Sequence, residues 1–113
     1  MVNMISGGLH AGGNLDIQDV LAIPLGAASY QQGLHWIVDI YHRLGELLRA
    51  AGVEGTLVGD EGGYGPQLDS HERAFELVVA AIERAGLRPG SDVALGLDVA
   101  ASSFYDDGCY RLR

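Results

Sequence analysis

Lysine is absent from this chain of 113 residues, in which seven basic residues face fifteen acidic ones. All seven basic residues are arginine, so the chain cannot supply a lysine general base, a Schiff-base lysine or the lysine of a phosphate-binding loop. The formal net charge of −8 weighs against a protein that binds the phosphate backbone of nucleic acids. We therefore expect no nucleic-acid partner.

Cysteine and long apolar runs are also scarce. Cys109 is the only cysteine, which excludes an internal disulfide and fits a reducing compartment. No apolar run approaches the roughly 18 residues of a membrane helix, and the N-terminus lacks the basic flank of a signal peptide. These absences predict a cytoplasmic protein without a membrane span. The apolar share of 48% is still enough for the core of one domain.

Apolar periodicity and turn residues predict an α/β order of elements. Short apolar runs at 2–5 and 20–23 indicate two strands, the second closed by Pro24. Apolar residues at steps of three and four then predict a helix that begins after Ser29 and ends at Gly52.

A second helix is predicted to begin at the capping-box-like pair Asp69 and Glu72 and to stop at Gly86. Both helices should turn an apolar stripe toward the core. The residues expected in these stripes are Leu34, Val38, Tyr41, Leu44 and Leu48 in the first helix, and Phe75, Val78, Val79 and Ile82 in the second.

The last part of the chain predicts a buried strand and a hairpin. Residues 91–100 are apolar on both faces apart from their ends, which is typical of a parallel strand covered on both sides. Asp98 falls where that strand should end. The pair Asp107-Gly108 indicates a tight hairpin turn.

Two acids, Glu61 and Asp98, are expected at the carboxyl ends of strands, where parallel α/β sheets place their chemistry. Glu61 follows Asp60 among glycines, and in an extended chain only one of two adjacent side chains can enter a given pocket. Glu61 is then either a carboxylic acid that donates a proton or part of a solvated turn. Asp98 is either a ligand of a hard cation such as Mg²⁺ or a helix N-cap.

Three polar residues near the N-terminus are candidates for a binding pocket. His10 lies between two glycine pairs, which suits a loop that moves over a ligand but also a simple exposed loop. Gln18 and Asp19 directly precede the second strand, where they either point into the same pocket or form a polar strand edge.

A histidine and carboxylate stripe on the first helix is a weaker candidate. His35, Asp39 and His42 share one helical face at a spacing that a metal could use. Arg43 and Glu46 adjoin this stripe, however, so we expect a solvated or partly packed face.

Three motifs in order resemble the enolase family, the phosphopyruvate hydratases. The run "MVNMISGGLHAGGNLDIQDVLAIPLGA" resembles the family's glycine loop, histidine and Gln-Glu pair before an apolar strand, and "VGDEGGYGP" resembles its acid-bearing loop. The run "LGLDVAASSFYDDGCYRL" resembles its metal-binding strand and the hairpin that follows. The resemblance implies an α/β fold, a partial TIM barrel that opens strand-strand-helix-helix-strand and reaches the start of a hairpin.

The resemblance also implies an activity and residue roles. Enolases are glycolytic lyases that dehydrate 2-phosphoglycerate to phosphoenolpyruvate with Mg²⁺, usually as homodimers. By resemblance, Glu61 is the catalytic proton donor, and Asp98 is a ligand of the Mg²⁺ ion. His10, Gln18 and Asp19 are implied substrate-binding residues.

The chain departs from the family in two kinds of feature. Ser6 stands where the family has asparagine, and Asp19 is one methylene shorter than the usual glutamate. A whole TIM barrel needs about 250 residues, so residues 1–113 are expected to be an incomplete N-terminal portion of the barrel domain, inactive alone because the lysine base is missing. The alternative is a non-catalytic, truncated enolase-like module that binds a partner or a divalent cation.

Overall fold

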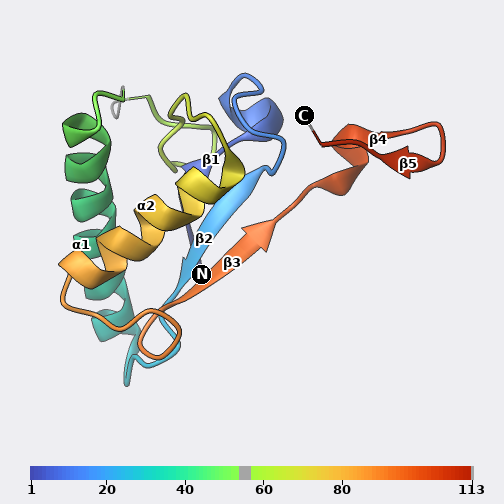
Figure 1. The fold of residues 1–113 in the computed structure, drawn as a ribbon. Helices are drawn as coiled ribbons and strands as arrows, with labels where there is room; N and C mark the ends of the chain where they lie inside the picture. The colour runs from blue at the N-terminus through green and yellow to red at the C-terminus, as the bar shows by residue number, and fades with distance from the viewer. Residues whose placement is uncertain (54–56, 113) are drawn as a thin grey trace.

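The structure is a computed structural model that describes residues 1–53 and 57–112. Two long helices and a three-stranded sheet form the body of the molecule, and a short hairpin follows them (Figure 1). The elements in chain order are β1 (Val2–Ser6), the 3-10 turn η1 (Gly8–Ala11), β2 (Asp19–Ile23), α1 (Tyr30–Ala50), α2 (His71–Arg84), β3 (Ala94–Asp98), the 3-10 turn η2 (Ala101–Phe104), β4 (Tyr105–Asp106) and β5 (Cys109–Tyr110).

The three main strands lie in the order β1-β2-β3, and β2 runs antiparallel to both neighbours. The prediction of a buried parallel strand at 91–100 is therefore wrong in two respects. β3 pairs antiparallel with β2, and its residues are half-buried or exposed. An apolar strand is buried only when other elements cover both of its faces. β3 is half-buried or exposed because it is an edge strand of the described sheet and the helices lie on one face only.

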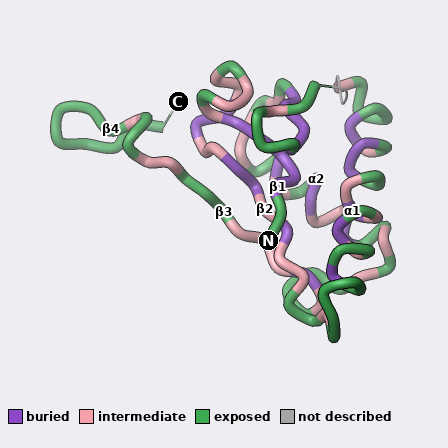
Figure 2. The backbone as a smooth tube through the Cα atoms, turned by 180° about the vertical axis from the view of Figure 1, so that it is seen from behind, coloured by how far each residue is buried: buried purple, intermediate pink, exposed green. Residues whose placement is uncertain are grey.

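Both helices pack side by side on one face of the sheet (Figure 1). The buried residues lie where the helices face the strands and each other, while the β4–β5 hairpin projects away from the body and is exposed (Figure 2). Val20 and Ala22 of β2 contribute to this core, whereas Leu21 between them is only half-buried. The described residues thus form an open α/β unit and do not close a barrel.

Helix α1 begins and ends as the sequence predicts and buries Leu44 and Leu48 of the predicted stripe, but its first half buries a different face. The hydroxyl of Ser29 accepts a hydrogen bond from the backbone N–H of Gln32 at 3.2 Å, which caps the helix. Leu34 and Val38 were expected in the core but are 47% and 44% exposed. The buried residues of α1 are Gly33, Ile37, Ile40, Leu44, Gly45 and Leu48.

The physical reason for this difference is that apolar side chains are spread around the first half of α1, so more than one stripe fits the helical period. Contacts with β1 and α2 then select the face that carries Ile37 and Ile40.

Helix α2 shows a similar small shift. Its N-cap is Ser70, whose hydroxyl accepts from the backbone N–H of Arg73 at 3.1 Å, and not Asp69. Val78 and Ile82 are buried as predicted, but Phe75 and Val79 are only half-buried. Ala74, Leu77 and Ala81 are buried in their place, so the buried set is Ala74, Leu77, Val78, Ala81 and Ile82.

The predicted hairpin turn is confirmed between β4 and β5. Asp107 and Gly108 both have positive φ, 46° and 80°, as a two-residue hairpin turn requires. None of the described helices is apolar over a stretch long enough to span a membrane.

Candidate functional site

One end of the sheet carries a row of three polar side chains. Cross-strand pairing places Ser6 opposite Asp19, and Asp19 opposite Asp98. Residues that lie directly opposite in antiparallel strands point to the same face, so this row faces away from the helices. β1 and β3 end at the row, and β2 begins there. Asp98 is therefore at a strand end, as predicted.

Glu61 lies in a tight turn and not at the end of a strand, which corrects the prediction. The N–H of Gly59 donates to the carbonyl of Gly63 at 2.7 Å, and the N–H of Gly62 donates back to Gly59 at 3.0 Å. The Glu61 side chain is 54% exposed. The glycines let the chain reverse within a few residues, which ends extended structure before Glu61 is reached.

Backbone and aromatic contacts hold this turn against β1 and α1. The N–H of Ser6 donates to the carbonyl of Tyr64 at 2.8 Å, and the N–H of Tyr64 donates to Met4 at 2.9 Å. The rings of Tyr41 and Tyr64 stack with centroids 4.3 Å apart, and the Tyr41 hydroxyl donates to the carbonyl of Gly62 at 2.9 Å. Burial, with a smaller effect of Tyr64, raises the pKa of Tyr41 above its ordinary value.

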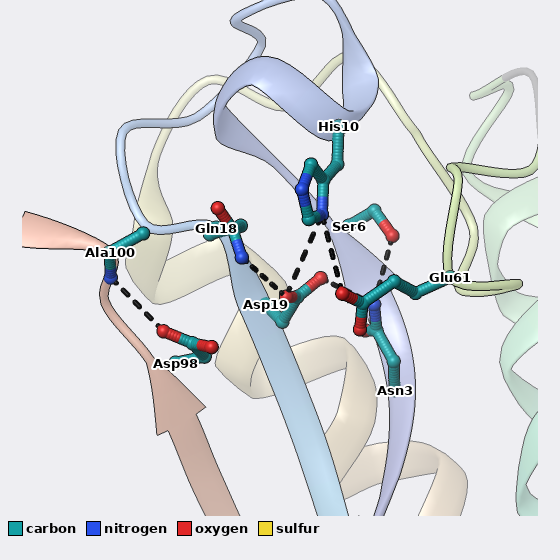
Figure 3. A network of polar contacts seen from close by, with 8 residues as sticks. All are labelled: Asn3, Ser6, His10, Gln18, Asp19, Glu61, Asp98 and Ala100. Carbon is teal, nitrogen blue, oxygen red and sulfur yellow. Dashed lines mark hydrogen bonds and ion pairs between the residues drawn. The ribbon is translucent and has the colours of Figure 1, made fainter. Parts of the chain in front are cut away.

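His10 projects from η1 toward both acidic side chains of the site (Figure 3). Its Nδ1 lies 3.9 Å from Oδ2 of Asp19 and 3.8 Å from Oε1 of Glu61. The Nδ1 atom is buried although the side chain is 26% exposed. The structure therefore places His10 between two carboxylates, and the exposed-loop alternative does not describe it.

Asp19 is the buried member of the site, with 1% of its surface exposed. Its Oδ1 accepts a hydrogen bond from Nδ2 of Asn3, and its Oδ2 accepts one from Nε2 of Gln18 at 3.2 Å. Asn3 also donates to the hydroxyl of Ser6 at 3.0 Å. A buried carboxylate needs such donors, because desolvation without them is costly.

Asn3 is a site residue that the sequence analysis missed. The available signal was an amide in the middle of an otherwise apolar strand, since a buried polar group requires a partner. The glycine turn approaches it closely, and a Cβ on Gly63 would lie 2.7 Å from Oδ1 of Asn3. Only glycine allows that approach without displacing the Asn3 amide.

Asp98 lies opposite Asp19 at the same end of the sheet, but its carboxylate is not among the ligand atoms that lie within 4.8 Å of one another. Its Oδ1 accepts the backbone N–H of Ala100 at 3.1 Å, which forms a local turn (Figure 3). The N-cap position of η2 is Ala100, without a side-chain cap, so the N-cap interpretation of Asp98 is wrong. A carboxylate oxygen is the donor that Mg²⁺ prefers, but a single carboxylate does not make a site.

The described residues contain one group of three side chains placed to share a cation. Ligand atoms of His10, Asp19 and Glu61 lie within 4.8 Å of one another. The stripe of His35, Asp39 and His42 on α1 does not form a second such group within the described ranges. His35 lies 3.6 Å from Asp39, and both side chains are exposed. The prediction of a solvated face for this stripe is confirmed.

A family model described as "Enolase, C-terminal TIM barrel domain" matches residues 1–113. The match includes the glycine turn, the histidine loop and the strand end described above.

Proposed function

The chain belongs to the enolase family, and we propose that it is part of the lyase that dehydrates 2-phosphoglycerate to phosphoenolpyruvate with Mg²⁺. The observation that carries this proposal is the meeting of His10, Asp19 and Glu61, which come from three separate segments, at one end of the sheet. We further propose that residues 1–113 are the N-terminal portion of the barrel domain of a cytoplasmic, homodimeric enzyme.

Glu61 is the proposed acid of this reaction. Hydroxide is a poor leaving group, so a positioned carboxylic acid must give its proton to the departing oxygen. The side chain of Glu61 is half-exposed, which leaves its carboxyl group accessible to substrate, while the turn that carries it is tied to β1 and α1. Accessibility and a fixed backbone are the two properties that this role requires.

His10 and Asp19 form the support for that acid. The imidazole lies between the two carboxylates, 3.8 Å from Glu61 and 3.9 Å from Asp19, so it limits the positions that the Glu61 side chain can take. Asp19 is held by Asn3 and Gln18, which fixes the position of its charge. His10, Gln18 and Asp19 then orient the substrate beside Glu61.

Asp98 is the residue proposed to hold Mg²⁺. When bound, the cation offsets the negative charge that builds up on the substrate when its proton is removed. The other ligands are not grouped around Asp98 among the described residues, so they come from residues outside this set. The base that removes the substrate proton is also not a lysine of these 113 residues.

The test uses the complete protein with Glu61→Gln, which keeps the shape of the side chain but cannot donate an acidic proton. Dehydration of 2-phosphoglycerate should fall by about 10²- to 10⁴-fold, while exchange of the substrate α-proton with solvent continues. Asp60→Asn is the matched control, because Asp60 is the exposed neighbour and should leave both rates unchanged. Equal loss of dehydration and exchange in the glutamine variant would remove Glu61 from the acid role.

A second candidate function is a non-catalytic module that binds a divalent cation, and the group of His10, Asp19 and Glu61 is the observation in its favour. Calorimetric titration of the complete protein with divalent cations, together with a 2-phosphoglycerate assay, separates the two. Tight binding that is lost in His10→Ala, in a complete protein without turnover, would support the module.

A further inference from the structure

His71, the first residue of α2, contacts the segment that carries two of the proposed substrate-binding residues. Its Nε2 accepts the backbone N–H of Asp16 at 2.9 Å and lies 3.4 Å from the N of Ile17, which also donates to it. The His71 side chain is 18% exposed. Asp16 and Ile17 directly precede Gln18 and Asp19, so the imidazole fixes the backbone from which those two side chains project.

We propose that His71 is a positioning residue of the candidate site, and that it holds the segment 16–19 only while its imidazole is neutral. This inference rests on the proposed function for its effect on substrate, but the contact itself does not depend on which reaction the site performs. None of the three sequence motifs contains His71, and its contacts follow from the fold alone.

The chemistry follows from what a ring nitrogen can accept. Nε2 receives a hydrogen bond from two backbone N–H groups, so it carries no hydrogen and the imidazole is the neutral Nδ1–H form. A proton on Nε2 would point at those two donors and break both bonds. Oδ2 of Asp16 lies 4.0 Å from Nε2 and offers the charged ring a competing partner.

The charges around the ring come from the loop and from α2. Asp16 on the loop, Asp69 before the helix and Glu72 on the helix line a cavity of about 500 Å³ beside His71, and among residues 1–53 and 57–112 no arginine lines it. The amino end of α2 opposes this negative charge. Both charge states of the ring are thus accommodated, but only the neutral one accepts from the backbone.

The contact extends to the histidine loop through a tight crossing of the backbone. The N–H of Gly7 donates to the carbonyl of Gln18, and the N–H of Gly8 donates to Leu15 at 2.8 Å. A Cβ on Gly7 would lie 2.3 Å from the carbonyl oxygen of Ile17, so the two segments are in direct contact. A shift of Ile17 therefore displaces the glycine loop that leads to His10.

Two substitutions separate the acceptor from the bulk of the side chain. His71→Gln places an amide oxygen near the position of Nε2 and does not titrate, whereas His71→Leu fills a similar volume without an acceptor. In the complete protein at pH 8, the leucine variant should raise KM for 2-phosphoglycerate about tenfold with a smaller change in kcat, because one lost acceptor is worth about one order of magnitude. The glutamine variant should stay close to the wild type.

The pH dependence of KM distinguishes a positioning role of His71 from a merely structural one, because a structural role would leave it unchanged. As the pH falls from 8 to 5, KM of the wild type should rise relative to that of His71→Gln, since only the wild type loses its acceptor. An identical pH profile for the two proteins would overturn the proposal. This comparison remains valid if the leucine variant does not fold.

Amide hydrogen exchange tests the contact without any substrate. The Asp16 and Ile17 amides of the complete wild-type protein should be protected at pH 8 and lose at least tenfold protection at pH 5, whereas His71→Gln keeps it. Unchanged wild-type protection between the two pH values overturns the inference. If none of the proteins dehydrates 2-phosphoglycerate, the proposed function fails, and the exchange pattern alone decides the role of His71.

Discussion

Replacing Asn3 by leucine tests whether the buried carboxylate of Asp19 depends on a neighbouring amide. Asp19 is 1% exposed, and Nδ2 of Asn3 donates to its Oδ1 and also to the hydroxyl of Ser6 at 3.0 Å. Leucine has the same number of non-hydrogen side-chain atoms as asparagine and the same branching, but it donates no hydrogen bond. The variant therefore removes both bonds with little change in packing.

The magnitude follows from the bonds that are lost. A hydrogen bond to a charged group is worth about 1.5–3 kcal/mol and a neutral one about 1 kcal/mol. Leucine also removes the buried Oδ1 of Asn3, which has no partner among the described residues, and this recovers about 1 kcal/mol. We expect Asn3→Leu to lower the free energy of unfolding by about 2 kcal/mol, roughly a thirtyfold change in the folding equilibrium.

Urea unfolding of the complete protein measures this change. Trp36, the only tryptophan of the 113 residues, packs against the core and provides a fluorescence signal. A double-mutant cycle with Asp19→Asn isolates the charged bond, because without the carboxylate charge the cost of Asn3→Leu should fall by about 1–2 kcal/mol. An equal cost in both backgrounds would refute the reasoning, since Asn3 would then stabilise the strand without supporting Asp19.

Two further predictions address stability at other places. Hydrogen bonds from Arg88 lower the pKa of Asp92 from 3.8 to about 2. The ionised carboxylate therefore stabilises the fold above about pH 4, and this contribution is lost as the pH falls toward 2. Between pH 7 and pH 2, the urea midpoint should fall less in Asp92→Asn than in the wild type. On α1, Ile40→Ala should cost about 2–5 kcal/mol and Leu34→Ala less than about 1 kcal/mol, and the reverse order in thermal unfolding would contradict the buried face that the structure shows.

The candidate site shows how far sequence reasoning reaches. Sequence patterns indicate His10, Gln18, Asp19, Glu61 and Asp98 as polar residues at loops and strand ends. The structure brings His10, Asp19 and Glu61 together, whereas Asp98, opposite Asp19 in the sheet, is not part of that group. No local signal in the sequence indicates that Tyr64 and Tyr41 anchor the glutamate turn. Their roles depend on a ring stack and a backbone pairing between distant segments, which no local pattern encodes.

Local chemistry in the sequence was enough to determine most element boundaries. A serine hydroxyl that caps α1, a glycine of positive φ after it, and the Asp107-Gly108 turn act within a few residues of where they stand. The tertiary structure decided the antiparallel direction of β3, the buried face of α1 and the meeting of His10 with two carboxylates. These features depend on which distant surfaces pack together, and many sequences with the same local signals allow more than one such packing.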